Sequence, residues 1–266
     1  MAELKWGRSY PWLYLLLITA AESLIAAGQT WAGVIIHTAL LVTLLIQAAA
    51  SDDGRLPLAL MLAPLIRLLS LLLPMSNLPM IYRYAAVSIP LFLAAFSVAR
   101  LSGYGFREIS LRPGWWHSQF FIALLGLPMG VTEYFILRPR PLVPDFRLAD
   151  LVVPALVLIV STGFLEELIF RGIIQKAAAD LMGRSRAVLF VAFLFAAMHI
   201  THRSWPDEIF VFLVGLVFSW IVFRTRSLTG VTMAHGINNI ILYLVLPFFP
   251  LTLGQVWLWL KGAGLY

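Results

Sequence analysis

The chain has 266 residues, of which 61% are hydrophobic and only 12% are charged, and its mean hydropathy is +0.90. Soluble domains carry about 25% charged residues, so these values exclude an ordinary soluble protein, whose core would need more polar sequence to cover it. The formal net charge of +6 comes from scattered basic residues, which argues against nucleic-acid binding and fits basic loops beside a membrane. The lack of cysteine excludes disulfides, thiolate metal sites and cysteine nucleophiles.

Apolar stretches of roughly 17–22 residues recur along the chain, each long enough to cross a bilayer as a helix. We interpret the first stretch as a retained helix rather than a signal peptide, because it lacks a small-residue cleavage site. About eight to ten apolar elements result, which makes the predicted fold all-α and polytopic. They lie near residues 11–29, 31–50, 56–74, 81–101, 118–137, 151–170, 187–200, 209–223 and 229–247, with a short terminal segment at 251–261.

Polar connectors separate these spans, the longest being residues 100–118, 138–150 and 175–186. Within the first, YGFREISLRPGWWHS is too polar to span, and is either an element at headgroup level or a loop with an aromatic anchor. The proline-rich second connector is the best internal boundary. It separates N-terminal helices with an interfacial segment (1–148) from helices that carry the chemistry (149–247). A C-terminal membrane-associated segment (248–266) follows, and all three parts form one integral membrane domain.

Basic residues favour one set of alternate loops, which places the N-terminus inside by the positive-inside rule. The loop at 138–150 argues against this orientation. The richer set holds Arg55, Arg100, Arg107, Arg112, Lys176, Arg184, Arg186, Arg224 and Arg226, and the poorer set holds Arg83, Arg138, Arg140, Arg147 and Arg203.

Ionisable residues inside spans are rare and are usually functional, paired, or both. In the N-terminal half they are Glu22, His37, Arg67 and Glu133. Arg67 can pair with either glutamate across helices. We interpret His37, alone on an apolar helix, as a hydrogen-bonded packing residue rather than a ligand.

The C-terminal half contains TGFLEELIFRGII, in which Glu166 and Glu167 are adjacent and Arg171 follows. Neighbouring residues of a helix point about 100° apart, so the two carboxylates face different partners. Glu167 and Arg171 are four residues apart, with the acid first, as a helical ion pair prefers. Glu166 has no such local partner. It is therefore either protonated or beside a water-filled cavity, where it would suit general-base chemistry.

Two later helices carry further polar pairs. FLFAAMHI places Phe195 and His199 four apart, and MAHGINNIILY places His235 and Asn239 four apart. Spacing alone does not choose between Asn239 and its neighbour Asn238. In one cavity, the glutamate and one histidine could activate water, while the other histidine and an asparagine donate hydrogen bonds to an oxyanion. Hydrolysis, a transport or proton-relay role, and a structural or partner-binding role all remain open.

The sequence lacks the motifs of other classes of intramembrane protease. No HExxH zinc motif, GxS-type nucleophile or GxGD motif occurs in a span. A metal site built from His199, His202, His235 and Glu166 is conceivable, but His202 lies in a predicted loop, so metal is disfavoured.

Together the elements EELIFR, FAAMH and HGINN resemble the EExxxR, FxxxH and HxxxN motifs of the CPBP family of intramembrane proteases. These are the CAAX-protease and bacteriocin-processing, or abortive-infection, proteins. The resemblance covers about residues 150–247. It implies a bundle of the eight-helix type with a catalytic cavity inside the membrane, open to the cytoplasm or to lipid. Residues 149–247 would be the CAAX-protease-like catalytic helices.

The resemblance also implies roles for individual residues. Glu166 would be the water-activating base assisted by His199, and His235 with Asn239 would stabilise the oxyanion, which favours Asn239 over Asn238. The structural ion pair would be Glu167 with Arg171, with Phe195 in support. No cofactor is expected. The implied function is a glutamate-dependent CAAX-type endopeptidase of the cell membrane, with membrane lipids and a membrane-associated peptide or protein as partners. A non-catalytic scaffold or immunity protein of the same fold is the alternative, and a proton-coupled transporter is disfavoured because no internal repeat is present.

Overall fold

The computed structural model describes residues 10–249, and every regular element within this range is helical. Seven helices are long and apolar enough to cross a membrane, and a shorter apolar helix, α1 (Tyr10–Ala26), precedes them. The predicted all-α, polytopic class is therefore confirmed. The predicted terminal segment at 251–261, and with it most of 248–266, lies outside the described residues.

The element bounds follow the apolar runs of the sequence. The first half contains α1, α2 (Thr30–Ala50), α3 (Arg55–Leu60), α4 (Leu62–Leu72), α5 (Met80–Leu101), α6 (Trp116–Leu124) and α7 (Gly126–Leu137). The second half contains α8 (Leu148–Val157), η1 (Leu158–Phe164), α9 (Leu165–Glu167), η2 (Leu168–Ile174), α10 (Gln175–Met182), α11 (Arg184–Ala197), η3 (Ile200–His202), α12 (Trp205–Thr225), α13 (Thr229–Ile240) and η4 (Ile241–Val245). Of the η segments, η3 is a 3₁₀ turn and the other three are π-helical.

The segments α8 to α10 form one continuous helix, Leu148–Met182, of 35 residues. The prediction of a connector at 175–186 was therefore wrong for its first part. The polar residues misled it, because Lys176 and Asp180 pair one turn apart on one face while Ala177, Ala178 and Met182 are buried on the other. Gly183, with φ +83°, ends the helix. At about 1.5 Å per residue it is about 52 Å long and exceeds the roughly 30 Å hydrocarbon layer, so an end must reach the interface.

The segment between α5 and α6 is a loop of turns, and it forms no helix at headgroup level. Trp115 and Trp116 are both 68% exposed at its end, where α6 begins. The segment is thus a loop with exposed tryptophans, and its position at headgroup level stays a prediction. Arg112 fixes this loop by donating from Nε to the Arg226 carbonyl oxygen over 2.7 Å.

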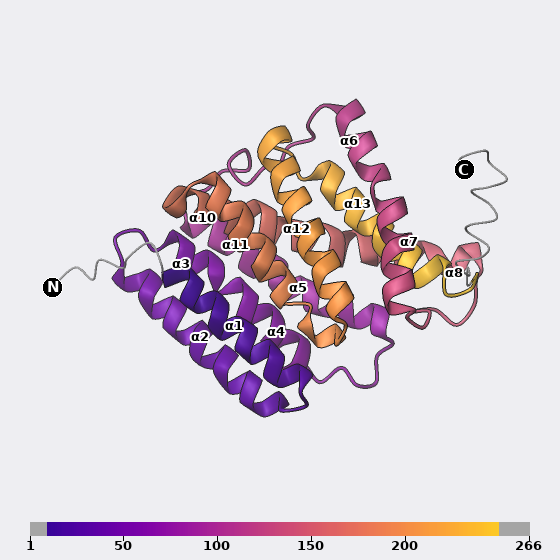
Figure 1. Cartoon of the computed structure of the whole chain (residues 1–266), viewed down its shortest axis with the longest axis horizontal. Helices are drawn as coiled ribbons and strands as arrows, with labels where there is room; N and C mark the ends of the chain where they lie inside the picture. The colour runs from indigo at the N-terminus through magenta and orange to yellow at the C-terminus, as the bar shows by residue number, and fades with distance from the viewer. Residues whose placement is uncertain (1–9, 250–266) are drawn as a thin grey trace.

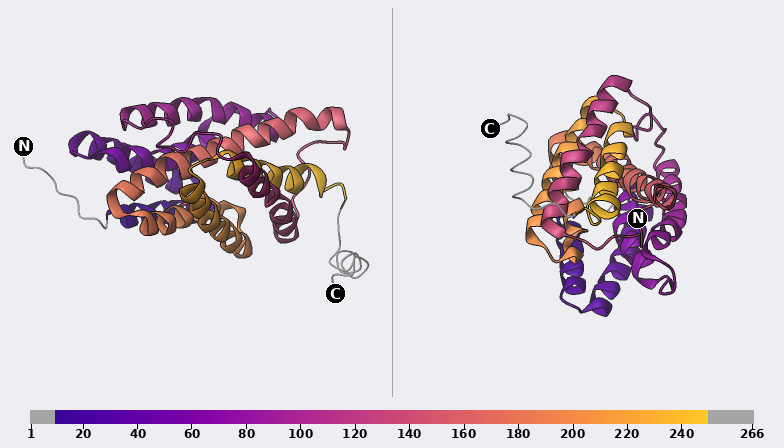
Figure 2. Two further views of the ribbon diagram at one scale, coloured as in Figure 1. Left: turned by 90° about the horizontal axis from the view of Figure 1, so that it is seen from above. Right: turned by 90° about the vertical axis from the view of Figure 1, so that its right-hand side faces the viewer.

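Two groups of helices flank α11 and α12. Figure 1 shows α1 to α4 on one side of the bundle and α6, α7 and α13 on the other, with α11 and α12 between them. α1 packs on α2 and α11, α11 packs on α12, and α13 lies against α6, α7 and η1. The long helix runs across the molecule between these groups (Figure 2).

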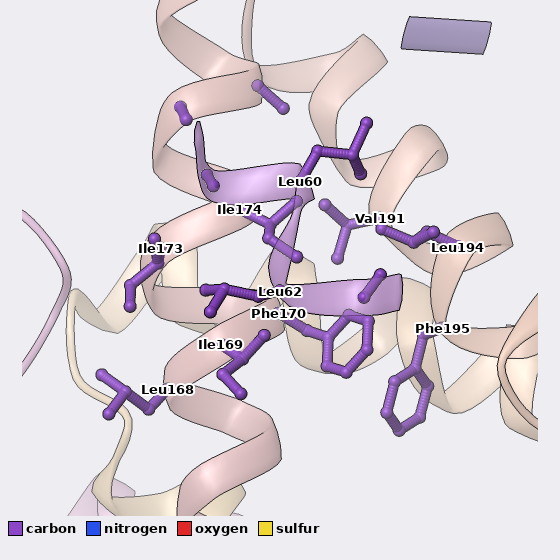
Figure 3. Close-up of a cluster of buried hydrophobic side chains, with 14 of the residues drawn as sticks. Leu60, Leu62, Leu168, Ile169, Phe170, Ile173, Ile174, Val191, Leu194 and Phe195 are labelled. Atoms are coloured by element: carbon purple, nitrogen blue, oxygen red, sulfur yellow. The ribbon is translucent and has the colours of Figure 1, made fainter. Parts of the chain in front are cut away.

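The largest buried apolar cluster joins both halves of the chain. Figure 3 shows Leu60 and Leu62, from the junction of α3 and α4, beside Ile169 and Ile174 of η2 and Val191 of α11. All five side chains are at most 2% exposed among the neighbours that surround them. This packing holds η2, and with it the adjacent glutamates, at a fixed depth in the bundle.

Glycine allows α13 to approach its neighbours closely. A Cβ atom on Gly130 of α7 would lie 2.7 Å from Ile241 Cβ and 2.8 Å from the Asn238 carbonyl oxygen. Gly236 of α13 is equally confined, because its Cβ would lie 2.7 Å from Ile159 Cγ1. Small residues at such crossings are typical of membrane helix pairs, where van der Waals packing drives association. They hold α13 against both η1 and α7.

Replacing Gly130 with alanine is therefore expected to destabilise the protein by about 1–3 kcal/mol, the usual cost of overpacking. The loss should occur although alanine is the better helix former by about 1 kcal/mol. Gly105→Ala is the control, since a Cβ there would meet only Glu108 Oε2, at 3.5 Å. The two melting temperatures in detergent provide the measurement. Equal stability of both variants would contradict the close packing of α7 on α13.

Candidate active site

The two adjacent glutamates lie on a short α-helical turn, α9, between the π-helical segments η1 and η2. A π-turn inserts one extra residue and changes which side chains face a given direction, and such turns are frequent at functional sites. Glu167 is fully buried, whereas the Glu166 side chain is 28% exposed. The adjacent carboxylates thus have different environments, as the helical geometry of the sequence predicts.

Glu167 has two cationic or protonatable neighbours. Its Oε1 lies 3.1 Å from Arg171 Nη1 and 2.9 Å from His235 Nδ1. The ion pair with Arg171 agrees with the spacing argument, but the contact with His235 was not predicted. Glu167 thus links the long helix to α13.

Phe195 connects Arg171 to the histidines. The Arg171 guanidinium carbon lies 3.9 Å from the centroid of the Phe195 ring, a cation–π contact. The same ring lies 4.6 Å from the His199 ring and meets the His235 ring edge-on at 6.2 Å. The Phe195 carbonyl oxygen also binds His199 Nδ1 over 2.7 Å. Phe195 therefore supports three of the polar residues around it.

His199 lies at the end of α11, where the helix changes to a 3₁₀ turn. A carbonyl oxygen can only accept, so the contact to Phe195 assigns a proton to Nδ1, and in a neutral ring Nε2 then has the lone pair. The end of this helix is held by the N-terminal half of the chain. Arg67 donates from Nη2 to the Met198 carbonyl oxygen over 2.8 Å and pairs with Glu22, also at 2.8 Å.

The sequence allowed Arg67 to pair with Glu22 or with Glu133, and the observed partner is Glu22. His37 Nε2 lies 3.2 Å from Glu22 Oε1, so this predicted packing residue has a polar neighbour within the same buried cluster. The cluster ties α1, α2 and α4 to the helix end that carries His199.

Asn238 and Asn239 have separate partners. Asn239 donates from Nδ2 to Thr162 Oγ1 over 2.9 Å, and Thr162 in turn donates to the Leu158 carbonyl oxygen. Asn238 donates from Nδ2 to Glu133 Oε2 over 2.5 Å and to Asn239 Oδ1 over 3.3 Å. These contacts orient the Asn239 amide, whose second Nδ2 hydrogen has no partner among the described residues.

Glu166, His199, His235 and Asn239 all line one cavity of about 140 Å³. One water needs roughly 10–15 Å³ of such space, so the cavity has room for several. The cavity lies between the long helix, α5, α7, α11, α12, α13 and η4. Glu166 Oε2 lies 3.9 Å from His235 Nε2, whereas no hydrogen bond or ion pair joins Glu166 to His199 within residues 10–249. The nearest histidine to Glu166 is thus not the one that the sequence argument paired with it.

A second cavity, of about 420 Å³, adjoins the first. Tyr84, Thr162, Glu166, His199 and His202 line both cavities. The rest of the second wall is mostly apolar and comes from α4, α5, η2 and the end of α11. Glu166 therefore lies where a polar cavity meets a larger apolar groove.

Sequence reasoning missed Tyr84 and Thr162 in the wall of the polar cavity. It considered Glu133 as a partner of Arg67, His202 as a metal ligand and Asn238 as the alternative to Asn239, and all three line the cavity. His202 was placed in a loop. It lies on the 3₁₀ turn, and its Nδ1 contacts Asp207 Oδ2 over 2.7 Å. The charge of Glu133 within an apolar span marked it as unusual, but the sequence did not place it in this cavity.

No three histidine, aspartate or glutamate side chains within residues 10–249 gather so that they could hold a metal ion. The four residues considered from the sequence line the same cavity, but His202 is turned to Asp207 and His235 to Glu167. That the protein uses no metal stays a prediction.

The contact between Asn238 and Glu133 can be tested by stability alone. Asn238→Ala leaves a buried carboxylate without its donor, so we expect a loss of about 1.5–3 kcal/mol, as for other hydrogen bonds to charged groups. Asn77→Ala, in an exposed turn, is the matched control. Thermal unfolding of the purified variants is the measurement. Restoration of stability by a second change, Glu133→Leu, would identify the unpaired carboxylate as the cause, and an unchanged Asn238→Ala variant would contradict this account.

Comparison with known proteins gives one match. The family model described as "Type II CAAX prenyl endopeptidase Rce1-like" matches residues 148–241. Comparisons with curated proteins and with solved structures gave no match. The matched segment contains Glu166, His199, His235 and Asn239, and excludes Glu133 and Arg67. Residues 148–241 of this multi-pass membrane protein thus form an Rce1-like domain, and the resemblance of its motifs to the CPBP family is confirmed for this part of the chain.

Proposed function

We propose that this protein is an intramembrane endopeptidase that hydrolyses peptide bonds of membrane-associated peptides or proteins. One observation carries the proposal: Glu166, His199, His235 and Asn239 come from three separate helices and line one cavity inside an apolar bundle. A carboxylate, two imidazoles and an amide in such a cavity are costly unless they are used or paired. The Rce1-like match of residues 148–241 supports the same chemistry.

In the proposed mechanism, Glu166 removes a proton from water, whose oxygen attacks the carbonyl carbon of the scissile bond. The lone pair on His199 Nε2 accepts a hydrogen bond from the same water and orients it. When the tetrahedral intermediate collapses, the C–N bond breaks and Glu166 delivers its proton to the leaving nitrogen. The proton removed from water is thus returned, and the carboxylate is ready for another cycle.

Two side chains of α13, Asn239 and His235, would stabilise the oxyanion of that intermediate by donating hydrogen bonds to it. Asn239 has one free Nδ2 hydrogen, and its amide is held by Thr162 and Asn238. His235 donates from Nδ1 to Glu167, and with both nitrogens protonated it would donate from Nε2 to the oxyanion. Pre-oriented donors of this kind are each worth about 10²–10³ in rate.

The larger, apolar cavity supports a substrate that is part of the membrane. An apolar peptide segment or attached hydrocarbon in this groove would lie beside Glu166 without crossing water. A multi-pass protein with such a groove would act on substrates of its own bilayer, which we propose is the cell membrane.

The test is cleavage by the purified protein reconstituted in liposomes with a set of membrane-anchored peptides, followed by mass spectrometry of the products. His199→Ala and Asn239→Ala should each remove the products. Glu208→Gln, which changes a carboxylate that lines neither cavity, is the control. Cleavage that survives in His199→Ala, or a cellular role that survives without any cleavage, would refute the proposal and favour a scaffold.

Cleavage should also survive removal of metal ions. Activity in the presence of EDTA or 1,10-phenanthroline is expected to stay within about twofold of the untreated enzyme, because water activation is assigned to a carboxylate. The measurement is the initial rate before and after chelation. Loss of activity that zinc restores would show that the histidines bind metal instead.

A further inference from the structure

The part of the long helix that follows the glutamates, from Arg171 to Asp180, borders another cavity. It has a volume of about 420 Å³ and lies between the loop after α5, the α10 segment, the start of α11 and the end of α12. These segments meet at the end of the bundle, near the label of α10 in Figure 1. Helices that span a membrane end at headgroup level, so this cavity is at the interface.

Basic side chains predominate in its wall. Arg107, Lys176, Arg184 and Arg226 line it together with the buried Arg171, against the two acidic residues Glu108 and Asp180. Five positive charges against two leave an excess of three.

The acidic residues of the wall are already engaged. Asp180 lies 2.6 Å from Lys176 Nζ and accepts a hydrogen bond from Tyr104 over 3.0 Å. Glu108 accepts from the backbone N–H of Gly105 over 2.8 Å. In contrast, Arg107, Arg184 and Arg226 have no ion pair within residues 10–249. Among the described residues, their charges thus have no acidic partner, and Arg184 contacts only the Phe223 ring, at 5.9 Å.

Arg171 adds a buried cation to this wall. It is 1% exposed, and only its Nη1 has a partner, while Nε and Nη2 have none among the described residues. An unpaired guanidinium nitrogen at this depth is costly. A ligand with several oxygen acceptors would lower that cost.

We infer that this cavity binds the phosphate group of an anionic lipid. Arginine favours phosphate because its planar fork donates two parallel hydrogen bonds to it. Basic cavities between membrane helices at the interface are suited to anionic headgroups, and the apolar Val222 and Phe223 in the same wall can contact the start of an acyl chain. This inference does not depend on the proposed proteolysis.

The binding links the interface to the fold around Glu167, since Arg171 lines the cavity wall and pairs with that glutamate. A ligand that binds only the folded protein raises its melting temperature in proportion to the logarithm of its concentration over Kd. Thermal stability therefore reports binding without any measurement of activity.

The experiment uses the full chain in neutral detergent, titrated with phosphatidylglycerol, phosphatidylcholine or inorganic phosphate. Retained lipid is counted by native mass spectrometry, and the melting temperature is measured in parallel. The test variant is Arg107→Gln/Arg184→Gln/Arg226→Gln. The matched control, Arg100→Gln/Arg186→Gln/Arg224→Gln, removes three exposed arginines from the same face, none of which lines the cavity.

Phosphatidylglycerol should be retained and should raise the melting temperature, with affinity reduced at least about tenfold in the test variant and less than about threefold in the control. Stabilisation by inorganic phosphate with the same arginine dependence, but without lipid retention, would keep the phosphate site and identify its source as free phosphate. Equal losses in both variants, or none, would overturn the inference. If the triple variant does not fold, Arg184→Gln alone should lower the affinity by about threefold or more.

Discussion

Replacing Glu166 with glutamine is expected to abolish peptide cleavage while leaving the protein folded. A general base contributes about 10²–10⁴-fold to the rate, and glutamine cannot accept the proton from water. The fold should tolerate the change, because the Glu166 side chain is 28% exposed and the nitrogen that lies near its carboxylate, His235 Nε2, is 3.9 Å away. The measurements are kcat/KM for a reconstituted membrane peptide and the melting temperature of the same preparation.

The adjacent residue provides the sharpest control. Glu167→Gln is chemically the same change one position away, but it removes the charge that Arg171 and His235 share. This variant should lose stability together with activity, whereas Glu166→Gln should lose activity alone. If Glu166→Gln kept more than about a tenth of the activity, the carboxylate could not be the general base. If both variants melted early, the two glutamates would have the same structural role.

Much of the fold follows from the sequence because the membrane imposes one simple rule. A chain without water must satisfy its backbone polar groups internally, so long apolar runs become helices. The predicted run at 81–101 is the helix α5, Met80–Leu101. The rule fails where polar residues lie on one face only. Lys176 and Asp180 led to a predicted connector, yet they pair on the exposed side of α10.

The sequence predicted four residues that line one cavity, but it did not predict the contacts that these residues make between helices. Spacing of four residues put Glu167 with Arg171 on one face, and that pair forms. Spacing carries no information between helices, so the contact of His235 with Glu167 and that of Asn238 with Glu133 were not foreseen. Those contacts depend on how closely α13 packs against η1 and α7. Gly130 and Gly236 allow that close packing.

The sequence analysis did not predict the π-turns. It assumed 100° per residue through TGFLEELIFRGII, whereas the segments on both sides of Glu166 and Glu167 are π-helical. An isolated helix gains nothing from a π-turn, so tertiary packing must stabilise it. The contacts that join the N-terminal helices to the site were not predictable from local sequence either. Arg67 reaches the Met198 carbonyl oxygen from α4, and no local pattern predicts that contact.

Arg171→Met is expected to cause the largest loss of stability of any substitution considered. Arg171 is 1% exposed and Glu167 is fully buried, so removal of the guanidinium leaves a charge in a low-dielectric site with His235 as its remaining partner. Breaking a buried ion pair costs about 3–5 kcal/mol, and the stacking on Phe195 at 3.9 Å is lost as well. For a protein of this size the melting temperature should fall by roughly 6–20 °C.

The double variant Glu167→Gln/Arg171→Met separates the ion pair from other effects of the substitution. It removes both charges and keeps a side chain of similar length over Phe195, and replacement of a buried ion pair by neutral groups is often nearly neutral. Glutamine at 167 can still accept a hydrogen bond from His235 Nδ1. The double variant should therefore melt higher than either single variant, with a coupling energy of about 2 kcal/mol or more in a double-mutant cycle. Additive losses would show that the two side chains act independently, and that the fold around Glu166 does not depend on their pairing.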